Sequence, residues 1–194
     1  MASIGPQNPS AATNNGLTNS VSRQWSNPGS VYTSDDSRAT AALDKSGVEG
    51  RSGSRRLLVT GFDFSAIPAD ATIDGVVVEV EKSTTSTSGS PKDAAIQLVN
   101  AANPFGVGDF KGNDEIWPTT DTYSTYGGAA DKWGLVLTRS DVVDAAFGVA
   151  ISAALQVDGA CTVQIDHVRI TVYYTEGASP PAAASATMGL MGVG

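Results

Sequence analysis

The stretch Ile73–Glu81, with the sequence IDGVVVEVE, decides the fold class. Its valines at positions 76, 78 and 80 share one face of an extended chain, while Glu79 and Glu81 share the other. Successive side chains of a β-strand alternate between two faces, so this pattern has the period of a strand and not of a helix. It predicts a half-buried antiparallel strand, with valines against a core and glutamates toward water.

Other stretches share this period of two. We expect further strands over Arg56–Phe64, Ala94–Val99, Trp133–Thr138, Phe147–Leu155 and Cys161–Tyr174. In the last of these the apolar phase changes after Ile165 and resumes at Val168, which predicts a β-bulge at Asp166 and His167. In Phe147–Leu155 the outward positions are Gly, Ala and Ser, so we expect something to pack closely on that face.

A helical period is found only in Arg139–Ala146, where Ser140 is a candidate N-cap. Strands separated by Gly, Pro, Asn and Asp turns favour an all-β fold, an antiparallel β-sandwich or jelly roll. The chain has 194 residues, which suits one domain.

The two ends of the chain lack both periods. We expect residues 1–24 to form an extended N-terminal arm, residues 25–176 the sandwich domain, and residues 177–194 a flexible tail rich in Gly, Ala and Pro. Arms of this kind become ordered on a partner, and their apolar side chains are candidate docking residues. These residues are Ile4, Leu17, Val21, Met188, Leu190 and Met191.

Composition excludes several classes of protein. The formal net charge is -8, and an acidic surface repels phosphate backbones. We therefore expect no nucleic-acid partner. No apolar stretch reaches the length of a membrane helix, so we expect no membrane partner either. Cys161 is the only cysteine, which excludes an intrachain disulfide and a cysteine-built zinc site.

Catalytic chemistry finds little support in the sequence. His167 is the only histidine, so any serine or cysteine mechanism would depend on it, and no nucleophile elbow accompanies it. We therefore expect no enzymatic activity and no cofactor. The sequence leaves the question of a calcium site open, because carboxylates from separate loops can bind calcium without forming a sequence motif. Trp117, Tyr123 and Tyr126 lie in one loop region and are candidates for contact with a ligand or another subunit. For Trp117 and Tyr126 the alternative is plain packing.

The order and spacing of several segments give a further indication. They are WSNPG at 25–29, SDDSRATAA at 34–42, GFDFSAIPADATIDGVVVEVE at 61–81, YGGAADKWG at 126–134, FGVAI at 147–151 and IDHVRITVYYT at 165–175. Together they resemble a β-sandwich domain of structural proteins in tailed bacteriophages, including decoration and tail-associated proteins. The resemblance spans about residues 25–175.

The resemblance implies a virion component without enzymatic activity. A short single domain with arms suits a capsid decoration, or cement, protein that binds the mature head. It implies the major capsid protein or another virion protein as partner, and homo-oligomers such as trimers. The protein would be made in the host cytoplasm and assembled onto the particle. The alternative is a tail- or fibre-associated module that recognises glycan on the host surface.

Overall fold

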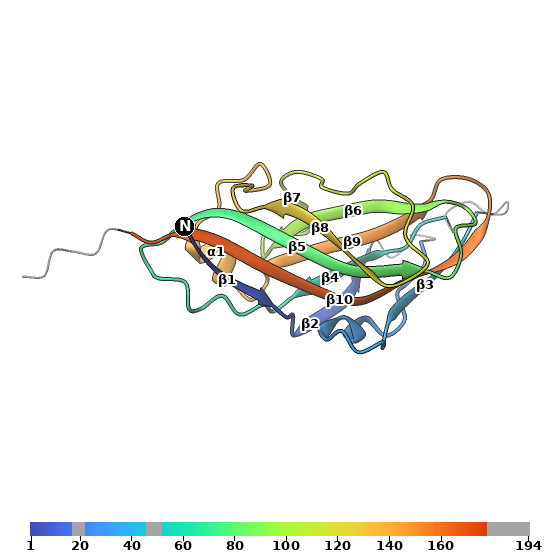
Figure 1. The fold of residues 1–194 in the computed structure, drawn as a ribbon, viewed down its shortest axis with the longest axis horizontal. Helices are drawn as coiled ribbons and strands as arrows, with labels where there is room; N and C mark the ends of the chain where they lie inside the picture. The colour runs from blue at the N-terminus through green and yellow to red at the C-terminus, as the bar shows by residue number, and fades with distance from the viewer. Residues whose placement is uncertain (17–21, 46–51, 178–194) are drawn as a thin grey trace, which may run out of the picture.

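The computed structural model describes residues 1–16, 22–45 and 52–177. Within them the chain forms two antiparallel five-stranded sheets. Sheet A has the order β1-β10-β5-β8, with β3 also paired to β10, and sheet B has the order β2-β4-β9-β6-β7. In Figure 1 sheet A, with β5 and β10 across its middle, lies in front of sheet B. The expected all-β sandwich is confirmed.

Sheet A consists of β1 (Ala2–Gln7), β3 (Ala39–Asp44), β5 (Thr72–Thr84), β8 (Thr122–Gly128) and β10 (Ala160–Thr175). Sheet B consists of β2 (Ala11–Asn15), β4 (Arg56–Thr60), β6 (Pro91–Asn100), β7 (Asn103–Val107) and β9 (Gly148–Leu155). Two short helices, η1 (Pro28–Tyr32) and α1 (Arg139–Val143), lie outside the sheets.

The long strands β5 and β10 pair with each other at the centre of sheet A. Val76, Val78 and Val80 of β5 are fully buried, as their alternation predicts. The pairing shifts register between Ile165 and His167 of β10, which confirms the predicted bulge. An extra residue at this point lets β10 keep apolar side chains toward the core on both sides of the shift.

The N-terminal segment differs from the expected arm. Residues 1–15 do not extend away from the sandwich, because β1 pairs with β10 in sheet A and β2 pairs with β4 in sheet B. Residues 8–10 carry the chain from one sheet to the other. Edge strands are held by backbone hydrogen bonds on one side, so they need no apolar alternation, and the sequence therefore gives no strand period here.

Three local predictions are wrong. Residues 133–138 form no strand; Trp133 has a φ of 57°, a left-handed conformation that interrupts extended backbone. The strand expected to reach Phe64 ends at Thr60, and Phe64 is buried from the loop that follows. Helix α1 is capped by Thr138 instead of Ser140: the Thr138 side chain accepts from the backbone N–H of Asp141, and the Asp141 carboxylate accepts from that of Thr138.

The small outward residues of β9 are covered by this chain itself. Ala150 is fully buried although it lies on the outward phase of the strand. The carbonyls of Pro104 and Phe105 accept hydrogen bonds from Asn15 of β2 and Arg56 of β4, two strands on the far side of β9. The chain at the start of β7 therefore crosses over β9, and close packing there is confirmed. Gly148 and Ala150 are therefore not open to a subunit interface.

Candidate functional site

Trp117 and Tyr126, two of the candidate contact residues, lie between the sheets. They surround an ion pair in which Lys82 Nζ of β5 lies 2.7 Å from Asp93 Oδ1 of β6. The Trp117 indole Nε1 donates to Asp93 Oδ1 at 2.8 Å, and the Tyr126 hydroxyl donates to Asp93 Oδ2 at 2.9 Å. The backbone N–H of Asn113 also donates to Oδ2, at 3.1 Å.

Burial sets the electrostatics of this cluster, which we call the inter-sheet cluster: Lys82, Asp93, Trp117 and Tyr126. The two charged side chains are 2% and 0% exposed. Burial lowers the pKa of Lys82, while the adjacent Asp93 carboxylate acts in the opposite direction. Burial also raises the pKa of Tyr126, with Asp93 adding to the effect. Lys82 Nζ lies 4.8 Å and 5.3 Å from the ring centres of Trp117 and Tyr126, a cation–π arrangement.

The same burial corrects part of the sequence interpretation. Trp117 is 1% exposed and Tyr126 is 3% exposed, so neither ring offers a face to a glycan or a second subunit. Their polar atoms are used to hold the Asp93 carboxylate. Buried Trp and Tyr side chains require such partners, which is why these two rings belong to the core and not to a platform.

Tyr123, the third candidate, lies on the outer face of sheet A. Its hydroxyl is 2.8 Å from Nδ1 of His167, and Nε2 of His167 is 3.0 Å from Oδ1 of Asn8. Because Asn8 Oδ1 is an acceptor, we assign the ring proton to Nε2. The Arg169 guanidinium lies over the Tyr123 ring at 4.2 Å and forms a two-pronged ion pair with Glu79. We call these five residues the outer-face cluster.

Ionisation at the bulge differs from that in free side chains. Burial lowers the pKa of His167, and the positive charge of Arg169 adds to this effect. Burial raises the pKa of Asp166, and the negative charge of Glu81 adds to it. Asp166 Oδ1 and Glu81 Oε2 are buried without a hydrogen-bond partner among the described residues. The bulge therefore gathers three titratable side chains where two carboxylate oxygens are poorly stabilised.

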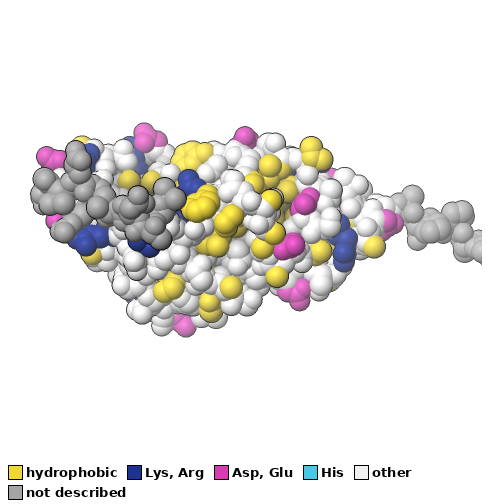
Figure 2. Space-filling model, turned by 180° about the vertical axis from the view of Figure 1, so that it is seen from behind, with side chains coloured by type: hydrophobic (Ala, Val, Ile, Leu, Met, Phe, Trp, Pro, Cys, Tyr) yellow, Lys and Arg dark blue, Asp and Glu magenta, His cyan; other side chains and the backbone are white. Residues whose placement is uncertain are grey.

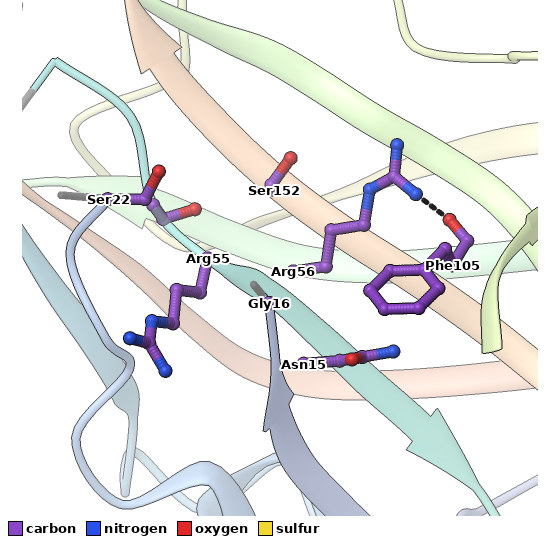
Figure 3. A pocket seen from close by; sticks show the side chains of 8 residues that line it. Asn15, Gly16, Ser22, Arg55, Arg56, Phe105 and Ser152 are labelled. Atoms are coloured by element: carbon purple, nitrogen blue, oxygen red, sulfur yellow. Dashed lines mark hydrogen bonds between the residues drawn. The ribbon is translucent and has the colours of Figure 1, made fainter. Parts of the chain in front are cut away.

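A surface pocket of about 250 Å³ opens over sheet B. It is lined by Asn15, Gly16, Ser22, Ser54, Arg55, Arg56, Phe105 and Ser152. Figure 3 shows the Arg56 side chain reaching to the Phe105 carbonyl, the Phe105 ring between Arg56 and Asn15, and Arg55 extending in another direction. A guanidinium, an amide and an aromatic ring together suit a small anionic or polar ligand with one flat apolar side.

The segment 103–117 runs along β6 and forms the edge of sheet B. Its backbone is tied to that strand by pairing of β7 with β6 and by the N–H groups of Lys111 and Trp117, which donate to the Ile96 and Pro91 carbonyls. Three of its apolar side chains face solvent: Phe105 at 41%, Phe110 at 51% and Ile116 at 44% exposed. We call this the edge segment. Figure 2 shows hydrophobic side chains gathered near the middle of the face behind the view of Figure 1.

The candidate docking residues divide between described and other parts of the chain. Ile4 lies in β1, where it is partly buried and packs against the core, so it is not available as a free anchor. The other five, Leu17, Val21, Met188, Leu190 and Met191, lie outside the described residues, as does most of the expected tail.

Two general findings concern the part of the chain that the structure describes. Within residues 1–16, 22–45 and 52–177, no three His, Cys, Asp or Glu side chains are grouped so that they could hold a metal ion. No helix in the same ranges is long and apolar enough to cross a membrane.

Comparison with known proteins adds no relative. No known family, no curated protein and no solved structure matches this chain.

Sequence reasoning missed the charged half of the inter-sheet cluster. The alternation of β5 could have revealed it. Lys82 continues the inward phase of Val76, Val78 and Val80, which predicts that its side chain faces the core. Its partner Asp93 lies in β6, beside a shift in the register of pairing with β9. The β6 residues that follow it alternate less clearly between apolar and polar side chains. The pocket was also missed, because Asn15, Arg56 and Phe105 are far apart in sequence and meet only through the crossing of the chain over β9.

Proposed function

We propose that this protein is a non-enzymatic structural component of a tailed-phage virion, and that within the virion it decorates and stabilises the mature head. The segments that resemble phage structural proteins and the two-sheet fold support this proposal. Its physical mechanism is adhesion to a repeating protein lattice, in which many modest contacts add up.

The observation that carries the proposal is the edge segment. Phe105, Phe110 and Ile116 belong to one piece of chain whose backbone is fixed against β6, yet their side chains are about half exposed. Large apolar side chains that stay exposed along one ordered piece of chain are typical of surfaces that bind another protein. A rigid edge of this kind loses little conformational entropy on docking, which favours a specific contact.

Charge supports the same function. The chain carries a net charge of -8, and Asp and Glu outnumber Lys and Arg by 20 to 12. A lattice coated with such copies presents an acidic outer surface that keeps particles apart in concentrated suspension. The apolar edge segment would face the shell and the acidic surface would face solvent.

Binding to purified heads tests the proposal. The protein is expected to sediment with expanded heads and not with unexpanded ones, at a copy number that matches the lattice. The triple variant F105S/F110S/I116S is expected to bind at least about tenfold more weakly, since it removes several buried apolar groups from the contact. The matched control is Val157→Ser, which changes an exposed apolar residue in the β9–β10 turn outside the edge segment.

Both variants are first compared with the wild type in thermal unfolding, so that loss of binding is not loss of fold. A triple variant that binds heads as well as the wild type would contradict docking through the edge segment. A few copies bound at one vertex would instead indicate a component of the tail.

The second candidate function is recognition of host glycan by a tail- or fibre-associated module. The pocket over sheet B supports it, whereas the buried rings of Trp117 and Tyr126 do not. Arg56, Asn15 and Phe105 offer the charge, the amide and the aromatic face that an acidic sugar requires. Trp117→Ala would be a poor test, because Trp117 is core. A glycan array with the wild type and Arg56→Gln is the appropriate one, and equal silence of both would remove this candidate.

A further inference from the structure

The inter-sheet cluster has a geometry that goes beyond an ordinary ion pair. Lys82 Nζ lies 2.7 Å from Asp93 Oδ1 with both side chains excluded from water. We propose that Lys82 and Asp93 condense to form an amide bond between their side chains, which covalently joins β5 of sheet A to β6 of sheet B. Both side chains that form this bond, and the residues around them, belong to this one chain.

The surroundings hold the two reacting groups together in a dry site. Lys82 has the aromatic faces of Trp117 and Tyr126 beside its ammonium group, so water cannot solvate the charge. Burial lowers the pKa of Lys82, which makes the neutral, nucleophilic amine more accessible than on the surface. Two reactive groups fixed at contact distance react with a high effective concentration.

Tyr126 is placed to move the proton that the reaction requires. Its hydroxyl lies 2.6 Å from Lys82 Nζ and 2.9 Å from Asp93 Oδ2, so it bridges the ammonium and the carboxylate. The phenol can accept a proton from Nζ as it donates its own to Oδ2, which leaves a neutral amine beside a neutral carboxylic acid. Its raised pKa keeps it a phenol before and after this relay.

The covalent step balances without a further reactant. The Nζ lone pair attacks Asp93 Cγ, the Nζ–Cγ bond forms, and the Cγ–Oδ2 bond breaks. Two of the three ammonium protons leave with Oδ2 as water, and the third stays on the amide nitrogen. The ion pair and the product have the same net charge of zero. Oδ1 remains as the amide oxygen, and the Trp117 indole N–H already donates to it and stabilises the charge that develops there.

A second lysine–aspartate pair in the same molecule provides a natural control. Lys92 Nζ lies 2.8 Å from Asp114 Oδ1, nearly the same distance as in the inter-sheet cluster, but the Asp114 side chain is 96% exposed. Water reaches the Asp114 carboxylate there and competes with Lys92 for it. The distance from nitrogen to oxygen is therefore nearly the same in the two pairs. The pairs differ in burial and in the Tyr126 hydroxyl, which only the inter-sheet cluster has beside it.

Mass spectrometry of the purified full chain tests the proposal. The wild type is expected to be lighter by one water than its sequence mass, under denaturing conditions that break every non-covalent contact. Lys82→Arg keeps a positive charge but has no lysine amine, and it is expected at its full sequence mass. A wild type that stays at its sequence mass after prolonged incubation would overturn the proposal.

Digestion with trypsin locates the bond. Lys82 is expected to resist cleavage, and the peptide 57–92 that contains it is expected to be joined to the peptide 93–111, which begins with Asp93. The peptide 112–132, which carries Asp114, is expected at its sequence mass. A water loss that maps to any other pair of residues would contradict the assignment.

Tyr126→Phe separates the relay from the fold. This variant keeps the ring and loses only the hydroxyl, so a thermal transition near that of the wild type shows that the sandwich is intact. It is expected to form the amide at least about a hundredfold more slowly, which is the lower end of the usual contribution of a positioned proton-transfer group. Formation at the wild-type rate would overturn the role of Tyr126.

Discussion

Strand β5 carries an ion pair on each of its two faces, and the two pairs are built differently. Lys82 faces the core and meets Asp93 where both side chains are almost fully buried. Glu79 faces outward and meets Arg169, with the two side chains 22% and 29% exposed. Both pairs have short contacts, 2.7 Å and 2.9 Å.

The difference shows that the surroundings of an ion pair, more than its length, determine what it does. The buried pair is enclosed by Trp117 and Tyr126, so removing either charge leaves the other without compensation. The outer pair can exchange its partner for water at small cost. We therefore expect the inner pair to tie the sheets together and the outer pair to arrange a surface.

The largest expected effect comes from Lys82→Met. It keeps a long side chain in the core but leaves the Asp93 carboxylate buried without its cation. The reference is Lys82→Arg, which keeps a positive charge and cannot form the amide. Relative to it, the free energy of unfolding is expected to fall by about 3–5 kcal/mol, as for other buried pairs broken on one side. Urea unfolding followed by tryptophan fluorescence measures this. A loss below about 1 kcal/mol would mean that the inner pair behaves like a surface pair.

Trp117→Phe tests how much the inner pair depends on its donors. The variant keeps an aromatic ring against Lys82 but removes the N–H that donates to Asp93 Oδ1. Because the buried Oδ1 of Asp93 loses one of its partners, we expect a loss of about 1–3 kcal/mol in the free energy of unfolding. Chemical denaturation beside the wild type is the measurement, and an unchanged midpoint would show that the bond contributes nothing.

His167 tests the outer face through pH. Burial lowers the pKa of His167, so the unfolded chain binds this proton more readily than the folded one. Stability from the neutral ring is therefore complete above the ordinary value of 6.5 and is lost as the pH falls below it. The wild type is expected to lose more stability than His167→Asn between pH 7.5 and pH 5.5 in thermal unfolding. Equal losses in the two proteins would contradict this assignment.

Arg169→Ala should have the smallest effect. The Glu79 carboxylate that it leaves behind is reached by water, and the Tyr123 ring loses only a partly exposed cation. We expect a loss of about 1 kcal/mol or less, and a smaller loss at high salt, because ions screen exposed pairs. Thermal unfolding at low and high ionic strength compares the two conditions. A loss as large as that of Lys82→Met would remove the distinction between the two faces.

Prediction from the sequence worked where one strand carries its own signal. The alternation of Val76, Val78 and Val80 and the phase change near Asp166 were both readable, because each depends on a few neighbouring residues. It failed at the N-terminal strands and at Trp133. There the conformation depends on backbone pairing with distant strands or on a left-handed residue, which leave no period in the side chains.

The candidate site was harder to predict. For Trp117 and Tyr126 the loop context left ligand contact, subunit contact and plain packing open, and only their burial decides for packing. Only the packing of sheet A on sheet B brings Lys82 of one sheet to Asp93 of the other.

By itself the sequence determined the strand class, the position of the β10 bulge and the acidic balance of charge, since period, phase and composition are local properties of a chain. The tertiary structure alone decided which polar groups are buried, which edge leaves Phe105, Phe110 and Ile116 exposed, and which lysine lies against which aspartate. These are decided by long-range packing, where pieces of chain with no relation in sequence exclude water from one another.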